Sequence, residues 1–356
     1  MAVLNRSVLT VNSGSSTLKG SLFSADGSRR NFHYEHVREP QEAFDRLMHD
    51  LGGDTPCAVG HRFVHGGEIA DPARLIDAVE RARLENLIPL APLHLPGNLL
   101  GIDLCAQRFP VPQVACFDTA FHTTMPELAK RLPIPNETGL RRFGFHGLNY
   151  AYIARVLPDI LGEAAHGKIV VAHLGSGASL CLMENLKSVD TTMGYTPAGG
   201  IPMGTRSGDL DPGVMLELAK RYAPEKLSDM VFHKMGLIAL SNGESGKMSD
   251  LLSSSSEHAK FAVQFFCRQV RAAIGSLAAK SGGIDAIVFS GGIGEHCPDT
   301  RIAICDPLAF MGFAVDTTAN QSGMSSIGRA GSKPILVIPA DEEKMIYGLC
   351  LEYLGM

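Results

Sequence analysis

The sequence has no long uninterrupted apolar run, no C-x-x-C cysteine pair and no excess of basic residues. Because a membrane-spanning helix needs about 20 consecutive apolar residues, no segment is expected to cross a membrane. The net charge of −5 argues against a general nucleic-acid binder. The eight scattered cysteines argue against a zinc centre or a disulfide framework and predict reduced, buried thiols. The N-terminal residues lack the layout of a signal peptide, so we expect a cytoplasmic protein.

Length and glycine content indicate what kind of protein remains. A chain of 356 residues is too long for one small core and predicts two domains. The 38 glycines cluster in short motifs rather than in low-complexity runs. Such motifs are typical of tight turns and of places where a ligand approaches the backbone closely.

The stretch from Val8 to Lys19 predicts a strand, a tight polar turn and a second strand. Its turn, Asn12-Ser-Gly-Ser-Ser16, would direct backbone N–H groups and hydroxyls into a small space that suits a phosphate. Lys19 adds a positive charge nearby. Taken alone, the turn is better explained as an ordinary hairpin connection, because short motifs often match by chance.

A second stretch, from Ile169 to Leu180, repeats this layout with a constant offset, so that Val8 falls on Ile169 and Asn12 on His173. Both stretches run from an apolar strand through a Gly/Ser turn into a second strand. The repeat predicts two related halves. Two such turns facing each other could hold a polyphosphate between two lobes.

Three further side chains follow strands or lie in rigid loops, where ligand contacts are common. Arg62 ends a short strand before a Gly-rich loop and could hold an anion bidentately or form a surface salt bridge. Prolines fix the loop around His94, which could bind an anion, donate a proton or be structural. Asp118 stands at the end of a strand, where open α/β sheets place ligand contacts, or it caps the next turn.

Two glycine-rich segments of the second half also have functional interpretations. Residues 190–213 show little periodicity, and the presence of Arg206, Asp209 and Asp211 favours a ligand loop over a linker. A buried strand leads into Gly291-Gly-Ile-Gly-Glu295, which suits a nucleotide at the start of a helix or serves only a tight connection.

The remaining pattern predicts further elements. Residues 24–40 are polar and mixed and are expected to form a surface excursion, and residues 234–256 are expected to be rich in loops. A C-terminal helix opens at Asp341-Glu-Glu343, where acids suit the helix dipole, so helix preference alone would explain Glu342. Apolar periodicity predicts helices at 41–51, 77–87, 98–109, 148–157, 214–222 and 261–279 and strands at 111–117 and 334–339.

Together these parts suit the transfer of a phosphoryl group, because that chemistry depends on positioning and charge neutralisation. The motifs that carry a resemblance are Asn12–Lys19, Gly60–Gly67, Ala91–His94, Phe117–His122, Arg142–Gly147, His173–Gly177, Met203–Pro212, Gly291–Glu295 and Pro339–Glu343. On these motifs the sequence resembles the acetate and propionate kinase family of the sugar kinase–heat-shock chaperone–actin superfamily over nearly its whole length.

The resemblance implies an α/β protein with a two-lobed, duplicated actin/ribonuclease-H-like fold, in which mixed sheets flanked by helices surround a central cleft. Residues 1–146 with about 340–356 would form the metal and carboxylate lobe, and residues 147–339 the nucleotide-binding lobe. The implied reaction is reversible, Mg²⁺-dependent phosphoryl transfer from ATP to acetate, giving acetyl phosphate and ADP. Mn²⁺ is the alternative metal. A homodimer without nucleic-acid or membrane partners is also implied.

The resemblance further implies a role for individual residues. Asn12 and Glu342 would hold the metal, so the C-terminal helix would pack on the first lobe. The catalytic residues would be Asp118, His146 and Arg206. The carboxylate substrate would be bound by Arg62, His94, Val64, Leu93, Phe145 and Pro197. The nucleotide would be bound by Lys19, His173, Leu174, Gly175, Ser176, Gly177, Gly292, Ile293, Gly294, Glu295 and His296.

Two residues depart from the family pattern near the nucleoside. Lys247 stands where an acid is expected and Ser249 where an arginine is expected, so a phosphate donor other than ATP stays open. Propionate or another short-chain carboxylate is the rival substrate, because one methylene is worth only about 1–3 kcal/mol of discrimination. A non-catalytic, actin-like nucleotide binder is the rival from another class. The joint presence of Arg62, His146 and Arg206 argues against it.

Overall fold

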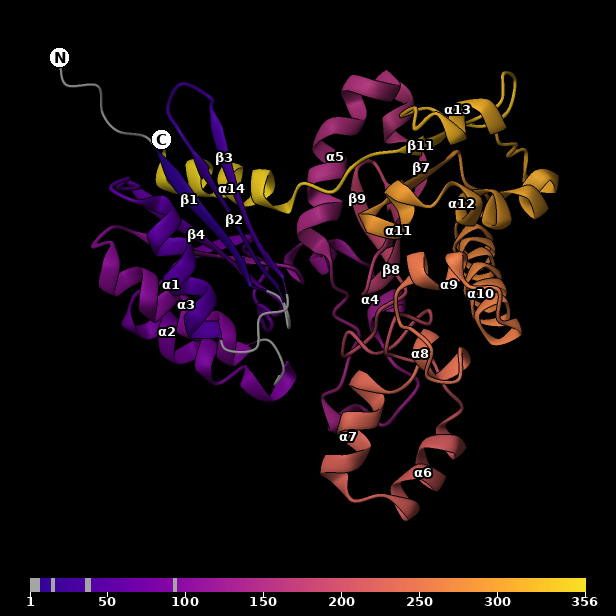
Figure 1. Cartoon of the computed structure of the whole chain (residues 1–356), viewed down its shortest axis with the longest axis horizontal. Coiled ribbons are helices and arrows are strands. Elements are labelled where there is room, and N and C mark those ends of the chain that lie inside the picture. The colour runs from indigo at the N-terminus through magenta and orange to yellow at the C-terminus, as the bar shows by residue number, and fades with distance from the viewer. Residues whose placement is uncertain (1–6, 14–16, 36–39, 92–94) are drawn as a thin grey trace. The chain divides into compact units, whose positions relative to one another are not determined.

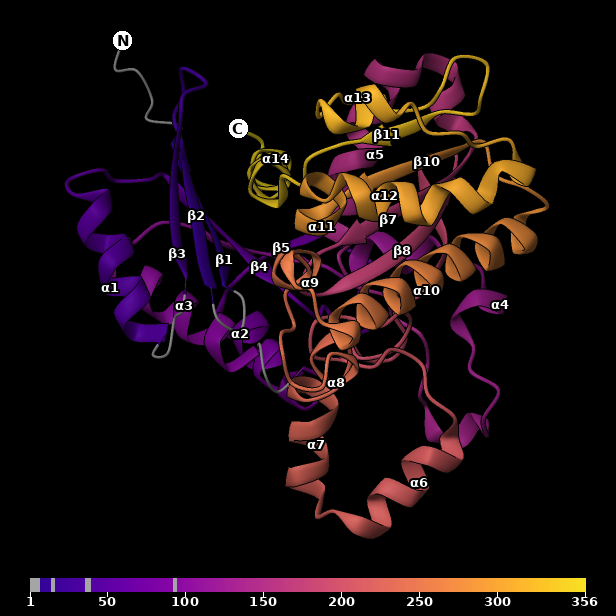
Figure 2. The same cartoon turned by 45° about the vertical axis from the view of Figure 1, so that its right-hand side comes forward.

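Two mixed β-sheets with the same strand pattern form the framework of the molecule (Figures 1 and 2). The computed structural model describes residues 7–13, 17–35, 40–91 and 95–356. The chain divides into two units. The first contains residues 1–123, 145–152 and 341–356, and the second contains residues 124–144 and 153–340. Each unit holds one of the sheets.

The first sheet has three antiparallel strands followed by parallel ones. Its strand order is β3 (Arg29–Glu35), β2 (Thr17–Phe23), β1 (Val8–Ser13), β4 (Ala58–Phe63), β6 (Gln113–Phe117) and β5 (Ala73–Leu75). The pairs β1–β2 and β2–β3 are antiparallel, whereas β1–β4 and β4–β6 are parallel. The short strand β5 adds an antiparallel edge beside β6.

The second sheet repeats this pattern without the extra edge strand. Its strand order is β9 (Lys187–Thr191), β8 (Ala178–Glu184), β7 (Lys168–Leu174), β10 (Ala286–Ser290) and β11 (Ile335–Val337). The pairs β7–β8 and β8–β9 are antiparallel, whereas β7–β10 and β10–β11 are parallel. The two predicted hairpins are therefore equivalent pairs, β1–β2 and β7–β8, and the predicted duplication is confirmed.

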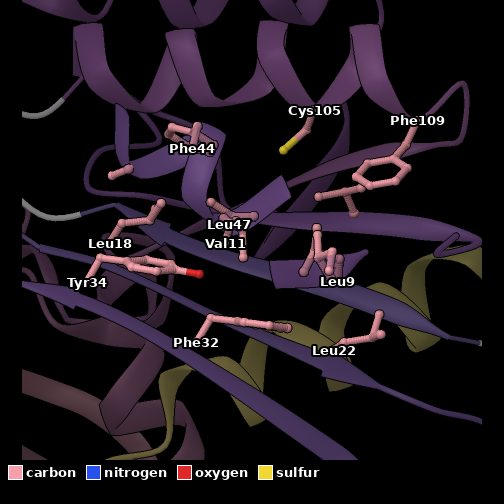
Figure 3. Packing of buried hydrophobic residues seen from close by; sticks show 13 residues of the cluster. Leu9, Val11, Leu18, Leu22, Phe32, Tyr34, Phe44, Leu47, Cys105 and Phe109 are labelled. Atoms are coloured by element: carbon pink, nitrogen blue, oxygen red, sulfur yellow. The ribbon is translucent and has the colours of Figure 1, made fainter. Parts of the chain in front are cut away.

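Helices cover both faces of the first sheet. α1 (Pro40–Leu51) and α3 (Leu95–Arg108) lie on one face, where Phe44 and Cys105 belong to the same buried cluster as Leu9 of β1 (Figure 3). Successive residues of a strand point to opposite faces, so the next residue back, Val8, faces the other side. There it joins a second cluster.

This second cluster anchors the C-terminal helix, α14 (Glu342–Leu354). Met345, Ile346 and Leu349 of α14 are buried in it together with Leu148 of α5 (Gly147–Leu161). Burying such a side chain contributes about 1.5–3 kcal/mol, so several of them hold the helix firmly on the sheet. The expected packing of the C-terminal helix on the first half of the chain is confirmed.

The other helices are short or amphipathic, apart from one long helix. They are α2 (Ala78–Glu85), α4 (Glu127–Lys130), α6 (Pro212–Arg221), α7 (Pro224–His233), α8 (Leu237–Leu240), α9 (Met248–Ser253), α10 (Glu257–Ser281), α11 (Gly291–His296), α12 (Pro298–Cys305) and α13 (Thr317–Gln321). The long helix α10 is capped at its start by Ser256, whose side chain accepts a hydrogen bond from the backbone N–H of Ala259, and at its end by Gly282 in a left-handed conformation. No helix of the described residues is long and apolar enough to cross a membrane.

The prediction for one segment of the first unit is wrong. Residues 24–40 were expected to form a surface excursion, but Arg29–Glu35 form strand β3 at the edge of the first sheet. Only Phe32 and Tyr34 of this strand are buried, and both belong to the cluster under α1. An edge strand that buries so few side chains carries a weak apolar signal, which explains the error. Within residues 234–256, the structure adds the two short helices α8 and α9.

Candidate active site

Polar side chains gather where β1, β4 and β6 of the first unit end. The parallel pairing places Val11 beside His61, and Arg62 beside Cys116. Asn12 and Asp118 each follow within two residues of these pairs. Because parallel strands end at the same edge of a sheet, Asn12, Arg62 and Asp118 meet there.

Arg62 links the other two side chains. Its Nε and Nη2 atoms donate to Oδ2 of Asp118 at 3.0 and 2.6 Å, and its Nη1 atom donates to Oδ1 of Asn12 at 3.1 Å. Asp118 is completely buried, and the Arg62 side chain is 15% exposed. A fork-shaped guanidinium that holds a carboxylate in this way is fixed in direction, which suits recognition of a planar anion.

The first turn of α14 completes the cluster. The Nδ2 atom of Asn12 donates to Oε2 of Glu342 at 2.8 Å and to Oε1 of Glu343 at 3.0 Å. Arg62 lies 3.7 Å from Glu342, measured between Nε and Oε2. Helix preference alone therefore does not explain Glu342, because its carboxylate is held in a defined polar cluster.

Burial and neighbouring charges compete at this cluster. Burial raises the pKa of Asp118 to about 6, and the charge of Glu342 adds to the rise, although Arg62 opposes it. Burial lowers the pKa of Arg62, but the charges of Asp118 and Glu342 outweigh this effect, so its pKa lies above the ordinary value. The Arg62–Asp118 pair is therefore ionised at neutral pH.

The oxygen atoms of this cluster suit a divalent cation. Oδ1 of Asp118 is buried without a hydrogen-bond partner of ordinary geometry, and three carboxylates surround Asn12 and Arg62. Among the described residues, no three His, Cys, Asp or Glu side chains form a ready metal cage. Mg²⁺ does not need one, because it keeps several waters and binds through one or two carboxylates and the substrate phosphates.

The segment around His146 abuts this cluster. The backbone N–H of Gly147 donates to the carbonyl oxygen of Asp118 at 2.9 Å, and a Cβ atom at position 147 would lie 2.0 Å from that oxygen. Only glycine fits there. His146 itself has a φ of 59°, a left-handed conformation that costs a non-glycine residue energy and that is concentrated at functional sites.

The other site residues predicted in the first unit lie outside the Asn12–Arg62–Asp118 cluster or outside the described residues. Lys19 is exposed and pairs with Asn12 across the β1–β2 hairpin, so the two side chains lie on the same face of the sheet. Val64 and Phe145 are both buried. Leu93 and His94 lie outside the described residues, as does the hairpin turn at residues 14–16.

In the second unit, the equivalent hairpin meets the Gly-rich segment of α11. His173 and Leu174 end β7, and the N–H of Gly175 donates to the carbonyl of Gly177 at 3.0 Å across the turn. Gly291 has a φ of 76°, and a Cβ atom there would lie 2.8 Å from the carbonyl oxygen of Leu174. Of the residues that the resemblance implies for the nucleotide, all but Lys19 lie on these two elements: His173, Leu174, Gly175, Ser176 and Gly177 on the hairpin, and Gly292, Ile293, Gly294, Glu295 and His296 in α11.

The long loop of the second unit reaches the same hairpin. The N–H of Gly204 donates to the carbonyl of Ser176 at 3.2 Å. Within the loop, Nη1 of Arg206 donates to the carbonyl of Pro197 at 2.7 Å, which joins two of the predicted residues. Burial lowers the pKa of Arg206 to about 10, so the side chain remains charged at neutral pH.

The sequence interpretation missed two polar residues of the first cluster. Glu343 accepts a hydrogen bond from Asn12, as Glu342 does. Because Glu342 was a predicted site residue, the adjacent acid Glu343 could have been predicted as well. Arg29 forms an ion pair with Asp341 at 2.7 Å and lies 3.7 Å from Glu343. It was missed because β3 was not recognised as a strand.

Comparison with known proteins identifies the family. The model of the acetokinase family matches residues 42–348 of this chain. An acetate kinase of Nitrobacter hamburgensis is 41% identical, with 96% of this chain and 94% of the relative covered. A propionate kinase of Salmonella typhimurium is also 41% identical, with 81% and 75% covered. The crystal structure of acetate kinase from Entamoeba histolytica superposes with a TM-score of 0.88 and 31% identity, covering 98% of this chain and 100% of that one.

These matches extend over both units and agree with the duplicated α/β fold. The family expected from the sequence motifs is confirmed. The chain belongs to the acetokinase family and is a phosphotransferase that acts on a carboxyl group.

Proposed function

We propose that this protein transfers a phosphoryl group reversibly between ATP and acetate, giving acetyl phosphate and ADP. The observation that carries the proposal is the buried Arg62–Asp118 pair beside Asn12 and Glu342. A protein that only binds nucleotide has no need for a second anion site of this kind. The name acetate kinase of the Nitrobacter relative supports the choice of substrate.

Arg62 would bind the carboxylate or the acyl phosphate, because its guanidinium is fixed and ionised. Asp118 would hold Arg62 in place and lie near the metal. His146 and Arg206 would stabilise the charge on the phosphoryl group during transfer, in which two anionic oxygens approach one phosphorus. Val64 and Phe145, which are buried and apolar, would surround the methyl group. Leu93, His94 and Pro197 would complete this substrate site.

Mg²⁺, when bound, would neutralise part of the charge of the donor phosphates. Asn12 and Glu342 would hold it, and Asp118 and Glu343 add carboxylate oxygens within the same hydrogen-bonded cluster. Oxygen ligands of this type suit Mg²⁺ and Mn²⁺. Lys19, which lies on β2 directly opposite Asn12 of β1, would contact the phosphates.

The second unit would bind the nucleotide, through the β7–β8 hairpin and α11. The first unit would then be the metal and carboxylate lobe. This division follows the duplication, since each half has a hairpin of the same design.

Propionate is the second candidate substrate, because a propionate kinase is as similar in identity as the acetate kinase relative. A hydroxamate assay that traps acyl phosphate tests both. We expect more acyl phosphate with ATP and acetate than with ATP and propionate or butyrate. The same assay is run with GTP and with pyrophosphate in place of ATP to test the alternative donors. Absence of product with every short acid would overturn the kinase proposal.

A cytoplasmic homodimer is part of the proposal. The eight cysteines are all free thiols, which suits a reducing compartment. Helices α6 and α7 bury none of their side chains, and Leu216 of α6 is 67% exposed. Val214 of α6 is exposed as well, and uncovered apolar side chains of this kind suit contact with a second copy. Light scattering should give twice the mass of the chain, and Leu216→Lys should lower it; a wild-type monomer would contradict this part.

A further inference from the structure

The second unit contains an arginine that is buried without a counter-charge. Arg301 in α12 is 1% exposed, and no carboxylate of the described residues forms an ion pair with it. Arginine is almost never fully buried unless it is paired, because removing its charge from water is costly. Burial accordingly lowers the pKa of Arg301. Its position therefore calls for a specific reason.

The contacts of Arg301 supply that reason. Nη1 donates to the carbonyl oxygens of Gly294 and Glu295 at 2.8 and 2.9 Å, and these two residues directly precede the last residue of α11. On its other side, Nε donates to Oδ1 of Asn320 at 2.7 Å and Nη2 to the Asn320 carbonyl at 3.1 Å. Asn320 is itself fixed by a bond of 3.0 Å to the carbonyl of Pro298. The guanidinium thus ties α11 to α13.

The opposite end of α11 is held by close packing. Gly291 lies so close to Leu174 of the hairpin that any side chain would meet its carbonyl oxygen. At the end that Arg301 holds, the carboxylate of Glu295 also accepts a hydrogen bond of 2.9 Å from the backbone N–H of Ala340. α11 has only six residues and is too short to be stable by itself. Its conformation depends on these ties.

We propose that Arg301 is a positioning residue for the phosphate donor: it fixes α11 against the β7–β8 hairpin so that residues 292–294 keep a donor-binding conformation. Asn320 serves the same purpose by holding Arg301. This inference rests on the proposed function, because it assumes that the donor binds at α11.

The test compares Arg301→Gln and Asn320→Ala with a matched control. Arg329→Gln is suitable, because Arg329 in the same unit also donates to a backbone carbonyl, that of Val315, but does not contact α11. KM for ATP, KM for acetate and kcat are measured for each protein, together with the melting temperature. ATP affinity is measured separately by calorimetry.

We expect KM and Kd for ATP to rise about 10- to 100-fold in Arg301→Gln, because small displacements of a binding segment have effects of this size. Asn320→Ala should raise the same two constants by a smaller factor. It is the test variant if Arg301→Gln does not fold. KM for acetate should stay within about twofold of the wild type in both, and Arg329→Gln should change neither constant.

Equal rises in both KM values, or a lower melting temperature with unchanged ATP affinity, would overturn the inference, because a purely structural residue would behave in that way. The outcome is separable from that of the proposed function. A wild type that binds ATP but forms no acyl phosphate would refute the function and leave the calorimetric test of Arg301 valid.

Discussion

The side-chain amide of Asn12 donates a hydrogen bond of 2.8 Å to the carboxylate of Glu342, although the two residues stand 330 positions apart in the chain. The first strand and the last helix of the chain therefore build one polar cluster, with Arg62 and Asp118 beside it. A residue near the C-terminus thus belongs to the candidate active site as directly as the opening hairpin does.

Replacement of Glu342 tests the proposed metal site. We expect Glu342→Gln to raise the Mg²⁺ concentration for half-maximal activity by about 10- to 100-fold, because a carboxylate ligand is lost while the shape is kept. Titration of activity with MgCl₂ measures this. Glu352→Gln, at an exposed position of the same helix, should titrate as the wild type does. Identical Mg²⁺ dependence in Glu342→Gln would remove Glu342 from the site.

The raised pKa of Asp118 predicts how stability depends on pH. A carboxyl group whose pKa is about 6 in the folded state and 3.8 when unfolded binds more protons in the folded state between these values. Its contribution to stability is therefore fully present below pH 3.8 and is lost as the pH rises through about 6. Asp118→Asn cannot titrate at this position.

Urea unfolding of both proteins between about pH 7.5 and 5 measures the effect. The free energy of unfolding of the wild type, relative to Asp118→Asn, should increase as the pH is lowered. A relative stability that falls over this range would mean that Arg62, rather than burial, determines the pKa of Asp118.

Because His146 has a left-handed backbone conformation, two substitutions can separate the effect of its imidazole on activity from the effect of its backbone strain on stability. His146→Ala removes the imidazole but keeps a Cβ atom at a φ of 59°, whereas His146→Gly removes both. We expect both variants to lose activity equally, because the imidazole is gone. His146→Gly should be more stable than His146→Ala by about 1 kcal/mol. Wild-type kcat in either variant would exclude the proposed role of the imidazole.

Arg206 should act in the transition state rather than in binding. We expect Arg206→Ala to lower kcat by about 100-fold or more while KM changes far less, as for other groups that meet developing charge. Arg206→Lys keeps the charge but not the fork that reaches the carbonyl of Pro197, so only partial activity should return. Steady-state kinetics decides, and an unchanged kcat in Arg206→Ala would remove it from this role.

The donor preference should depend on Lys247 and Ser249, which are both exposed at the start of α9. We expect the double variant Lys247→Asp, Ser249→Arg to lower KM for ATP, because an acid can accept the ribose hydroxyls and an arginine can stack on the base. KM for pyrophosphate, which has neither group, is the internal control and should not fall. Equal changes for both donors would show that these positions do not contact the nucleoside.

The sequence predicted the duplicated framework well, because it rests on local signals. The stretches Val8–Lys19 and Ile169–Leu180 carry apolar strands on either side of a Gly/Ser sequence, and both antiparallel strand pairs occur as expected. The long helix α10 follows apolar periodicity, and the acidic first turn at Asp341–Glu343 predicted the start of α14. Strand β3 was missed, because only two of its side chains reach the core.

What the sequence by itself determined is the chemistry that is present: the arginines, the acids after strands and the glycine-rich turns, each readable from its neighbours. Only the tertiary structure decided which of them act together. Asn12 meets Glu342 and Glu343 because Met345, Ile346 and Leu349 bury α14 against the sheet that carries β1. Arg301 of α12 meets Asn320 of α13, 19 positions further along the chain. Contacts between distant segments arise from burial of whole faces, and no local pattern encodes them.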